Sequence, residues 1–368
     1  MSGSERRIRC AVVGLGKMGL SHLAILNTQP GVEIAAVCDS TRYVVDVLAK
    51  YCGFKTYKDF DSMLETEQLD AVVLATPSRL HASMVGKALG RRLHVFCEKP
   101  FVLDPVEGER LVQLAEQAGL INQVGYHYRF VGAFQEAARI AKSGALGRLH
   151  HIRVEAYGPV VLRPAGATWR SAAAEGGGAL HDYACHALDL MHFVAGAAEH
   201  VSGSALGYVF SRSVEDEAYC TLRFPDGASG HLAVNWTDES CRKMTTQISA
   251  WGTNGRLTAD RQECRLYLRM PHAGLPGARE GWTVRYTTDL TAPESFYLRG
   301  EEYSAQIKYF VRAIRDRNIA NINSFRSALV TDRLVAMIRA DASGASPRTA
   351  ATPRRKWWGR LLRRRGAT

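Results

Sequence analysis

The stretch IRCAVVGLGKMGLSHLAILNTQPGVEIAAVCD, residues 8–39, decides the fold. It begins with a short apolar run that stops at Gly14, and apolar residues at helical spacing follow Gly19. A second apolar run then leads to Asp39. Short β-branched runs bounded by glycine are typical of strands, and a 3.6-residue spacing is typical of a helix. The stretch therefore predicts a strand, a glycine turn, a helix and a second strand, the opening unit of a parallel sheet.

The same alternation continues to about residue 124. Apolar runs at 70–77 and 92–100 are separated by helical patterns, and one more helix and strand follow them. Continuous apolar strands that alternate with helices are typical of a parallel sheet covered on both faces. We therefore predict an α/β protein whose residues 1–124 form a Rossmann domain, a doubly wound parallel sheet that binds a dinucleotide.

The pattern changes after residue 125. The run RLHHIRVEAYG at 148–158 alternates apolar and polar residues, and the PDG and TNG turns at 225–227 and 253–255 are typical of hairpins. Helical spacing returns at three places: 179–195, 301–318 and 323–341. Residues 125–342 are therefore predicted to form an α+β domain with a largely antiparallel sheet.

The positive charge of the chain is concentrated at its end. The formal net charge is +11, and eight arginines and lysines after Asp341, where no acidic residue follows, leave only +3 for the rest. This near balance argues against nucleic-acid binding. We predict a flexible basic tail at 343–368. Its segment RRKWWGRLLRRR, 354–365, would place two tryptophans and two leucines on one helical face, as in segments that lie on anionic membranes. The alternative is a basic tail without a partner.

The eight cysteines are scattered without a CxxC pair, and the N-terminal apolar run is too short for a signal peptide. This pattern favours reduced thiols in the cytoplasm, with peripheral membrane contact through the tail as a further expectation. We expect no metal site, because His127, His150 and His151 lack a familiar ligand spacing.

The glycine turn predicts the cofactor. In a G-x-G-x-x-G motif between a strand and a helix, the glycines allow a tight turn and a close approach of pyrophosphate to the helix N-terminus. Asp39 lies 25 residues after Gly14 and suits a ribose diol, which favours NAD over NADP. Ser40 and Arg42 keep NADP open as an alternative. The predicted cofactor-binding residues of this unit are Gly14, Gly16, Lys17, Met18, Gly19 and Asp39.

Five motifs together resemble those of one family. They are the G-x-G-x-M-G turn, ATPSRLHASM at 75–84, CEKP at 97–100, GYHYRF at 125–130 and GGGALHDYACHALDL at 176–190. In this order, over about residues 7–342, the chain resembles the Gfo/Idh/MocA oxidoreductases. The resemblance implies a Rossmann domain followed by a domain with an open sheet that often makes oligomer contacts. It therefore also implies a homo-oligomer, either a dimer or a tetramer.

The resemblance also implies roles for single residues. Thr76, Pro77 and His81 would lie along the cofactor, with Glu98 and Lys99 beside the nicotinamide. Asp182 and His186 would face the substrate. The chain departs from the family where His127 and Tyr128 stand in place of a frequent asparagine and arginine, and where Ala184 replaces glycine.

The residue types fit oxidation of a secondary alcohol, in which a base takes the hydroxyl proton. Asp182 and His186 lie one helical turn apart, so His186 is predicted to accept the proton while Asp182 orients its ring or bonds a neighbouring hydroxyl. Lys99, at a strand end, is predicted to bond the reacting oxygen, to lower the pKa of that oxygen, or to pass the proton itself. The three glycines before this helix are expected to let the chain approach the cofactor. Further candidates, with structural roles as the alternative, are Tyr126 and Trp169 for the substrate and Arg170 for a phosphate.

The sequence thus predicts an NAD(P)-dependent dehydrogenase or reductase acting on CH–OH groups of a sugar, nucleotide sugar or cyclitol. The stretch at 157–178 is similar to family members found among sugar and surface-polysaccharide genes. Two alternatives stay open: a non-catalytic dinucleotide-sensing protein, and a reductase of a non-sugar substrate.

Overall fold

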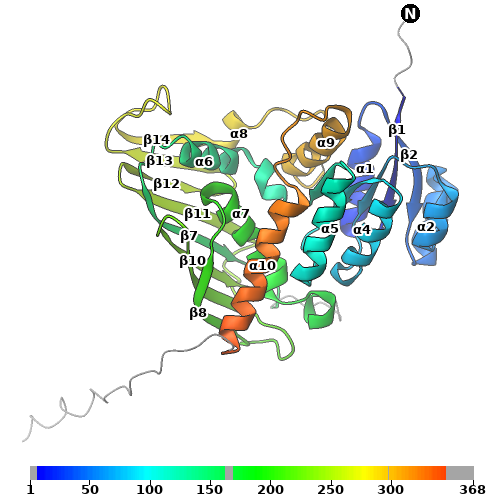
Figure 1. The fold of residues 1–368 in the computed structure, drawn as a ribbon, viewed down its shortest axis with the longest axis horizontal. Coiled ribbons are helices and arrows are strands. Elements are labelled where there is room, and N and C mark those ends of the chain that lie inside the picture. The colour runs from blue at the N-terminus through cyan, green and yellow to red at the C-terminus, as the bar shows by residue number, and fades with distance from the viewer. Residues whose placement is uncertain (1–5, 162–168, 297, 345–368) are drawn as a thin grey trace, which may run out of the picture.

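The structure, a computed structural model, describes residues 6–161, 169–296 and 298–344. A parallel sheet with its helices forms one half of the molecule, and a larger sheet forms the other. Figure 1 shows α10 running between the two halves, and its first turns pack on one half while its later turns pack on the other.

The first sheet has six parallel strands in the order β3-β2-β1-β4-β5-β6. These strands are β1 (Ile8–Val13), β2 (Val32–Cys38), β3 (Thr56–Tyr57), β4 (Ala71–Leu74), β5 (His94–Cys97) and β6 (Asn122–Val124). The chain proceeds from β1 to β3 on one side of the sheet and from β4 to β6 on the other. In sheets of this kind, ligands bind in the crevice outside the carboxyl ends of the two strands where the order changes, here β1 and β4. The predicted doubly wound parallel sheet is therefore confirmed.

Helices cover both faces of this sheet. Its strands are therefore buried on both sides, which explains why their sequences are unbroken apolar runs. One face packs against side chains of α1 and α9, and the other against α4, α5 and the start of α10. The helices of the first half are α1 (Lys17–Asn27), α2 (Arg42–Cys52), α3 (Phe60–Thr66), α4 (His81–Gly90) and α5 (Pro105–Gln117), with a 3-10 turn η1 (Ser78–Leu80) before α4.

The last two helices, α9 (Glu301–Arg315) and α10 (Phe325–Ala342), return to the first half. Phe310 meets Phe96 edge to face with ring centroids 5.9 Å apart, and Phe325 stacks on Phe101 at 4.2 Å. The later turns of α10 belong to the core of the second half. The helices predicted near 301–318 and 323–341 are confirmed, whereas the domain boundary at 124 stays a prediction.

The second sheet has eight strands in the order β14-β13-β12-β11-β7-β10-β9-β8. Every neighbouring pair is antiparallel except β7 and β10. The strands are β7 (Leu149–Tyr157), β8 (His200–Gly207), β9 (Glu217–Arg223), β10 (Ser229–Asn235), β11 (Thr245–Gly252), β12 (Gly255–Ala259), β13 (Glu263–Leu268) and β14 (Gly281–Tyr286). The predicted largely antiparallel sheet is confirmed, with both predicted turns joining strand pairs.

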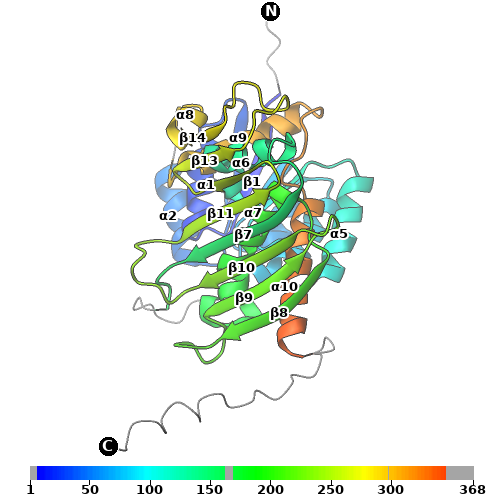
Figure 2. The same cartoon turned by 90° about the vertical axis from the view of Figure 1, so that its left-hand side faces the viewer.

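One face of this sheet carries the core, under α6 (Gly132–Lys142), α7 (Cys185–Ala195) and α10. Figure 2 looks onto the opposite face, over which no described helix passes. Short elements complete the described chain: η2 (His127–Phe130), η3 (Trp169–Ser171), η4 (Ala173–Glu175), the π-helical turn η5 (Leu180–Ala184) and α8 (Thr287–Leu290).

Within the described ranges, no helix combines the length and the apolar character that crossing a bilayer requires. All eight cysteines lie within these ranges and are free there. Residues 354–365, the predicted membrane-surface segment, lie outside them.

A buried ion pair fixes the loop between the two halves. Arg129 of η2 donates from Nε and Nη2 to the Asp189 carboxylate of α7, at 2.9 and 2.6 Å. Its remaining nitrogen Nη1 donates to the Ile322 carbonyl before α10. The two side chains are only 4% and 1% exposed, so this single arginine links three segments that are distant in the sequence.

We predict that Asp189→Ala lowers the free energy of unfolding by about 3–5 kcal/mol, because it leaves the Arg129 charge buried and unpaired. Arg110→Ala, which removes an exposed pair with Glu107, should cost less than about 1 kcal/mol. Urea unfolding followed by circular dichroism measures both. Equal effects would show that the buried pair contributes no more than a surface pair.

Candidate active site between the two sheets

The glycine turn between β1 and α1 has room for a phosphate. Gly14 has a φ of +83°, and a Cβ there would lie 2.5 Å from the Ala75 carbonyl oxygen. A Cβ on Gly19 would collide with the Gly14 carbonyl, whereas a Cβ on Gly16 would meet nothing within 4 Å. The first and third glycines therefore serve internal contacts. The second leaves open space at the helix N-terminus, where the backbone suits an anion, and Lys17 and Met18 follow it as the first residues of α1.

Asp39 lies beside this turn at the end of β2. Its carboxylate accepts from the Leu15 amide at 2.5 Å and from the Thr41 amide at 2.7 Å. Arg42, the residue that kept NADP open, donates instead to Asp46 on the surface of α2. The described residues thus fit a ribose diol and place no free arginine against Asp39, which agrees with NAD.

The loops after β4 and β5 are tied together by His81. This side chain is fully buried, with Nδ1 2.8 Å from the Pro100 carbonyl and Nε2 3.0 Å from the Thr76 carbonyl. Burial lowers the pKa of His81. A neutral imidazole carries one N–H, so in that state the ring donates to only one of the two carbonyls and packs against the other. Pro77 follows Thr76 on the exposed side of the same loop. Contact of these three residues with the cofactor stays a prediction.

Lys99 is held by Asp182 across the two halves. Its Nζ lies 3.0 Å from Asp182 Oδ1 and 2.9 Å from the Asp182 carbonyl oxygen. The other carboxylate oxygen, Oδ2, accepts from Arg170 Nε at 2.9 Å. Lys99 and Asp182 are 13% and 7% exposed, so the pair is screened only weakly by water.

The charges in this group favour ionised states. Burial alone would raise the pKa of Asp182, but the positive charges of Lys99 and Arg170 outweigh it and hold that pKa below its usual value. Burial alone would lower the pKa of Lys99, and the Asp182 charge reverses this and raises it. At neutral pH the site therefore contains an ammonium group and a carboxylate in contact.

The π-helical turn η5 presents Asp182 to Lys99. In such a turn the ordinary i to i+4 bonding is interrupted, which is frequent at functional sites. The Asp182 carbonyl accepts from Lys99, and the buried thiol of Cys185 donates to the His181 carbonyl at 2.9 Å. The local unwinding therefore supplies the second contact that fixes Lys99.

The three glycines have a reason that the sequence did not reveal. Gly176 and Gly178 have φ of +81° and +99°, in the left-handed region. A Cβ on Gly177 would lie within 3.0 Å of three backbone carbonyl oxygens, those of Trp169, Arg170 and Ala172. The expected close approach to a cofactor stays a prediction. What the structure requires is a close approach of the chain to its own turn η3, which carries Arg170 to Asp182.

His186 lies in a cluster of aromatic rings. Its centroid is 4.9 Å from that of His127, 5.2 Å from Tyr128 and 6.0 Å from Tyr126. Burial first, and then the Lys99 charge, lower the pKa of His186 well below its usual value, so the imidazole is neutral. No hydrogen bond joins Asp182 to His186 within the described chain. The prediction that Asp182 orients this ring is corrected: its carboxylate pairs with two cations and orients Lys99 instead.

The predicted substrate residues differ in their surroundings. Tyr126 is buried, and its hydroxyl has no partner among the described residues. The Arg170 guanidinium lies 4.8 Å from the Trp169 ring, over its face. Arg79 of η1 donates from Nε to both Glu175 oxygens at 2.7 Å, which connects the cofactor half to η4 beside the site.

Two residues at the site were not predicted from the sequence. Tyr303 of α9 stacks on His127 at 4.6 Å, and burial with the nearby Glu98 charge raises its pKa to about 12. His22 of α1 contacts Glu98. Nothing in the sequence connected 303 with 127, which are 176 positions apart. The one indication for His22 was its place on the inward face of α1, where an apolar residue is the usual occupant.

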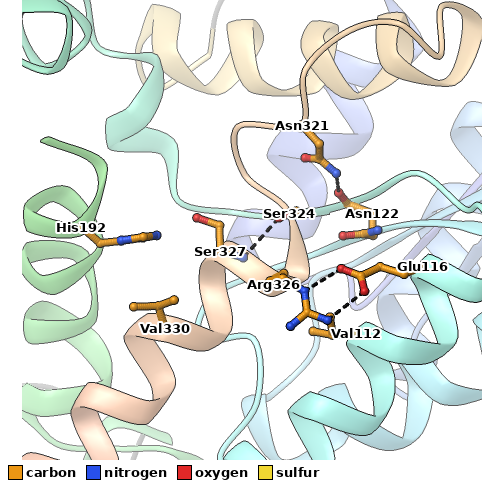
Figure 3. A pocket seen from close by; sticks show the side chains of 9 residues that line it. All are labelled: Val112, Glu116, Asn122, His192, Asn321, Ser324, Arg326, Ser327 and Val330. Carbon is orange, nitrogen blue, oxygen red and sulfur yellow. Dashed lines mark hydrogen bonds and ion pairs between the residues drawn. The ribbon is translucent and has the colours of Figure 1, made fainter. Parts of the chain in front are cut away.

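A separate hollow lies between α5, α7 and the start of α10 (Figure 3). Its volume is about 500 Å³, and Arg326 at its edge is paired with Glu116. His192 of α7 also lines it, but none of the predicted site residues does. The candidate active site is therefore the Lys99 and Asp182 group and not this hollow.

Comparison with known proteins agrees with this geometry. Residues 8–126 match the family model described as an oxidoreductase family with an NAD-binding Rossmann fold, and residues 134–258 match the Gfo/Idh/MocA C-terminal domain. The chain belongs to the Gfo/Idh/MocA oxidoreductase family. The predicted family, the enzyme class and NAD as the cofactor of the fold are thereby confirmed.

Several characterised proteins are similar over most of the chain. The scyllo-inositol 2-dehydrogenase (NAD(+)) of Bacillus subtilis is 28% identical over 69% of this chain and 74% of that protein. The myo-inositol 2-dehydrogenase of Thermotoga maritima is 25% identical over 86% of this chain and 87% of its own. The crystal structure of GenD2 from gentamicin A biosynthesis in complex with NAD superposes with a TM-score of 0.75 at 25% identity, covering 94% of this chain and 96% of that one.

We predict that Gly177→Ala lowers kcat/KM by about tenfold or more, because the added methyl displaces η3 and with it Arg170. Gly90→Ala at the end of α4, where a Cβ would meet nothing within 4 Å, is the matched control and should keep wild-type activity. Initial rates at 340 nm and thermal melts compare the two variants. Unchanged activity in Gly177→Ala would contradict the requirement for a glycine there.

Proposed function

We propose that the protein is an NAD-dependent dehydrogenase that transfers a hydride between the cofactor and a secondary alcohol or ketone carbon of a cyclitol, sugar or nucleotide sugar. The observation that carries this proposal is the Lys99 ammonium, fixed by the carboxylate and the carbonyl of Asp182 at 3.0 and 2.9 Å. It follows β5 at the carboxyl edge of the parallel sheet, where such sheets bind ligands.

The residues divide the work of the reaction. NAD, when bound, takes up or returns the hydride. Lys99 keeps its proton at neutral pH, so it donates a hydrogen bond to the reacting oxygen and stabilises negative charge there. The neutral imidazole of His186 has a lone pair that can accept the hydroxyl proton. Asp182 keeps Lys99 in place and compensates its charge.

The surroundings favour an uncharged polyol. Three described arginines around the site are paired within the chain: Arg170 with Asp182, Arg79 with Glu175, and Arg261 with Glu302. A fourth, Arg299, lies 5.7 Å from the centroid of the Tyr303 ring. The rings of His127, Tyr128 and Tyr126 beside His186 suit the apolar face of a sugar or cyclitol ring. The two inositol dehydrogenases among the relatives support the same substrate class.

We predict turnover with NAD⁺ in preference to NADP⁺, measured at 340 nm against cyclitols, free aldoses and UDP-sugars, with cyclitols and free sugars ahead of UDP-sugars.

Lys99→Met should reduce kcat at least a thousandfold, because the reacting oxygen loses its donor, while NADH still binds. Lys87→Met, at an exposed lysine paired with Asp61, is the control and should keep full activity. NADH binding without turnover on any substrate would favour a dinucleotide sensor instead.

The homo-oligomer is proposed to form through the uncovered face of the second sheet, joining two copies about a twofold axis. Trp282 and Tyr286 of β14 are 55% and 54% exposed there, and Tyr267 and Val284 are beside them in the register of the sheet. Figure 2 shows that no described element covers this face. Grouped exposed aromatic residues are typical of protein interfaces, and a twofold contact lets the same patch meet itself.

We predict that the wild-type protein elutes as a dimer or tetramer in light-scattering chromatography and that Trp282→Glu with Tyr286→Glu yields a smaller species. The buried contact would then have to accommodate unpaired charges. Tyr51→Glu, at an exposed tyrosine of α2, should leave the assembly intact. A monomeric wild-type protein would contradict the proposal.

The basic tail is proposed to hold the enzyme at the cytoplasmic surface of an anionic membrane, where it would supply precursors for polysaccharide assembly. The support is the sequence of 354–365, with two tryptophans and two leucines among seven arginines and lysines. The eight free cysteines agree with a reducing compartment.

We predict that the full chain co-sediments with vesicles containing phosphatidylglycerol and not with pure phosphatidylcholine. Deletion of 345–368 should leave the protein in the supernatant with its kcat unchanged. Substitution of Trp357 and Trp358 by alanine, which keeps the charge, should weaken binding in part. Equal sedimentation of the full and the shortened chains would contradict membrane attachment.

A further inference from the structure

His22 is a buried polar residue to which none of the roles described so far has been assigned. It stands on α1, the helix that the glycine turn opens, and its side chain is 0% exposed. Its Nε2 lies 2.6 Å from Oε1 of Glu98, which is 76 positions later in the chain. Because an ionised carboxylate only accepts hydrogen bonds, Nε2 carries the proton and donates it. The edge of the ring meets Phe96 at a centroid distance of 5.1 Å, which fixes its orientation.

The Glu98 carboxylate is held on three sides. Oε1 accepts from His22, and Oε2 accepts from the Lys99 amide at 3.2 Å. Gly125 closes the third side, since a Cβ there would lie 2.9 Å from Glu98 Cδ. His22 is the contact that joins this carboxylate to the helix of the cofactor turn, so without it the side chain would lose its anchor on that side.

Glu98 is therefore a fixed negative charge. Burial alone would raise the pKa of Glu98, but the His22 hydrogen bond and the neighbouring positive charges outweigh it and hold that pKa below its usual value. The charge of Lys99, the nearest cation on the same loop, is compensated by Asp182. The Glu98 charge is thus left to act on whatever occupies the carboxyl edge of β5.

We propose that His22 is a positioning residue which, by holding the Glu98 carboxylate beside the nicotinamide pocket, makes the protein bind NAD⁺ more tightly relative to NADH. The inference rests on the proposed function, which places the nicotinamide at this edge. The nicotinamide ring is a cation in NAD⁺ and neutral in NADH, so a fixed carboxylate in a poorly hydrated site stabilises the oxidised form selectively. A purely structural role would affect both forms alike.

The test compares the dissociation constants of NAD⁺ and NADH, by fluorescence titration, in three variants of the full-length protein. His22→Leu removes the donor, and we expect NAD⁺ binding to weaken about tenfold and NADH binding by no more than about twofold. His22→Gln carries an amide nitrogen near the position of Nε2 and should restore the wild-type ratio. His22→Asn places its amide near the position of Nδ1, too far from Glu98, and should behave like His22→Leu.

A second variant protects the test from a loss of folding. Glu98→Gln keeps the size of the side chain and removes the charge, so its ratio of the two dissociation constants should move in the same direction as that of His22→Leu. Thermal melts of all variants identify any that fail to fold. An unchanged ratio in both His22→Leu and Glu98→Gln would overturn the inference, as would a His22→Gln variant that resembles His22→Leu. A wild-type protein that binds neither cofactor would instead refute the proposed function.

Discussion

The contact between the Lys99 ammonium and Asp182 is the interaction on which the rest of the site depends. It joins residues 83 positions apart, one at the end of a parallel strand and the other in a π-helical turn below the second sheet. Both groups are largely removed from water, so neither charge is stable without the other. The arrangement of η3, the three glycines and η5 follows from this pair, because each serves to bring a carbonyl, a carboxylate or Arg170 to one place.

Charges and neutral rings are separated within the same small volume. The ionised groups have partners: the Lys99 ammonium contacts Asp182, the Glu98 carboxylate accepts from His22, and Arg129 pairs with Asp189. The titratable rings that remain, His127 and His186, are buried among tyrosines, and burial lowers the pKa of each. A fixed donor therefore stands close to a neutral acceptor, which is the combination that a reversible proton transfer beside a hydride transfer requires.

The glycine run at 176–178 illustrates how far a motif can be interpreted without a structure. Its presence before Asp182 predicted a site there, and its reason was assigned to an approach of the cofactor. The three carbonyl oxygens around Gly177 belong to 169–172, and their position depends on a turn that no local pattern predicts. In the same way, the helical spacing of Asp182 and His186 suggested a pair, whereas two cations from elsewhere in the chain attract the carboxylate more strongly than a neutral imidazole does.

The sequence by itself determined the two sheets, the glycine turn, the position of Asp39 and the family motifs with Lys99, Asp182 and His186. These features depend on periodicity and on local backbone conformation, which are properties of neighbouring residues. Only the tertiary structure decided the partners of those residues: Arg170 for Asp182, His22 for Glu98, Tyr303 for His127, and the return of α9 and α10 to the first half. Such partners come from segments brought together by burial of apolar surface, and the energy of a buried charge depends on what that burial places within a few ångströms of it.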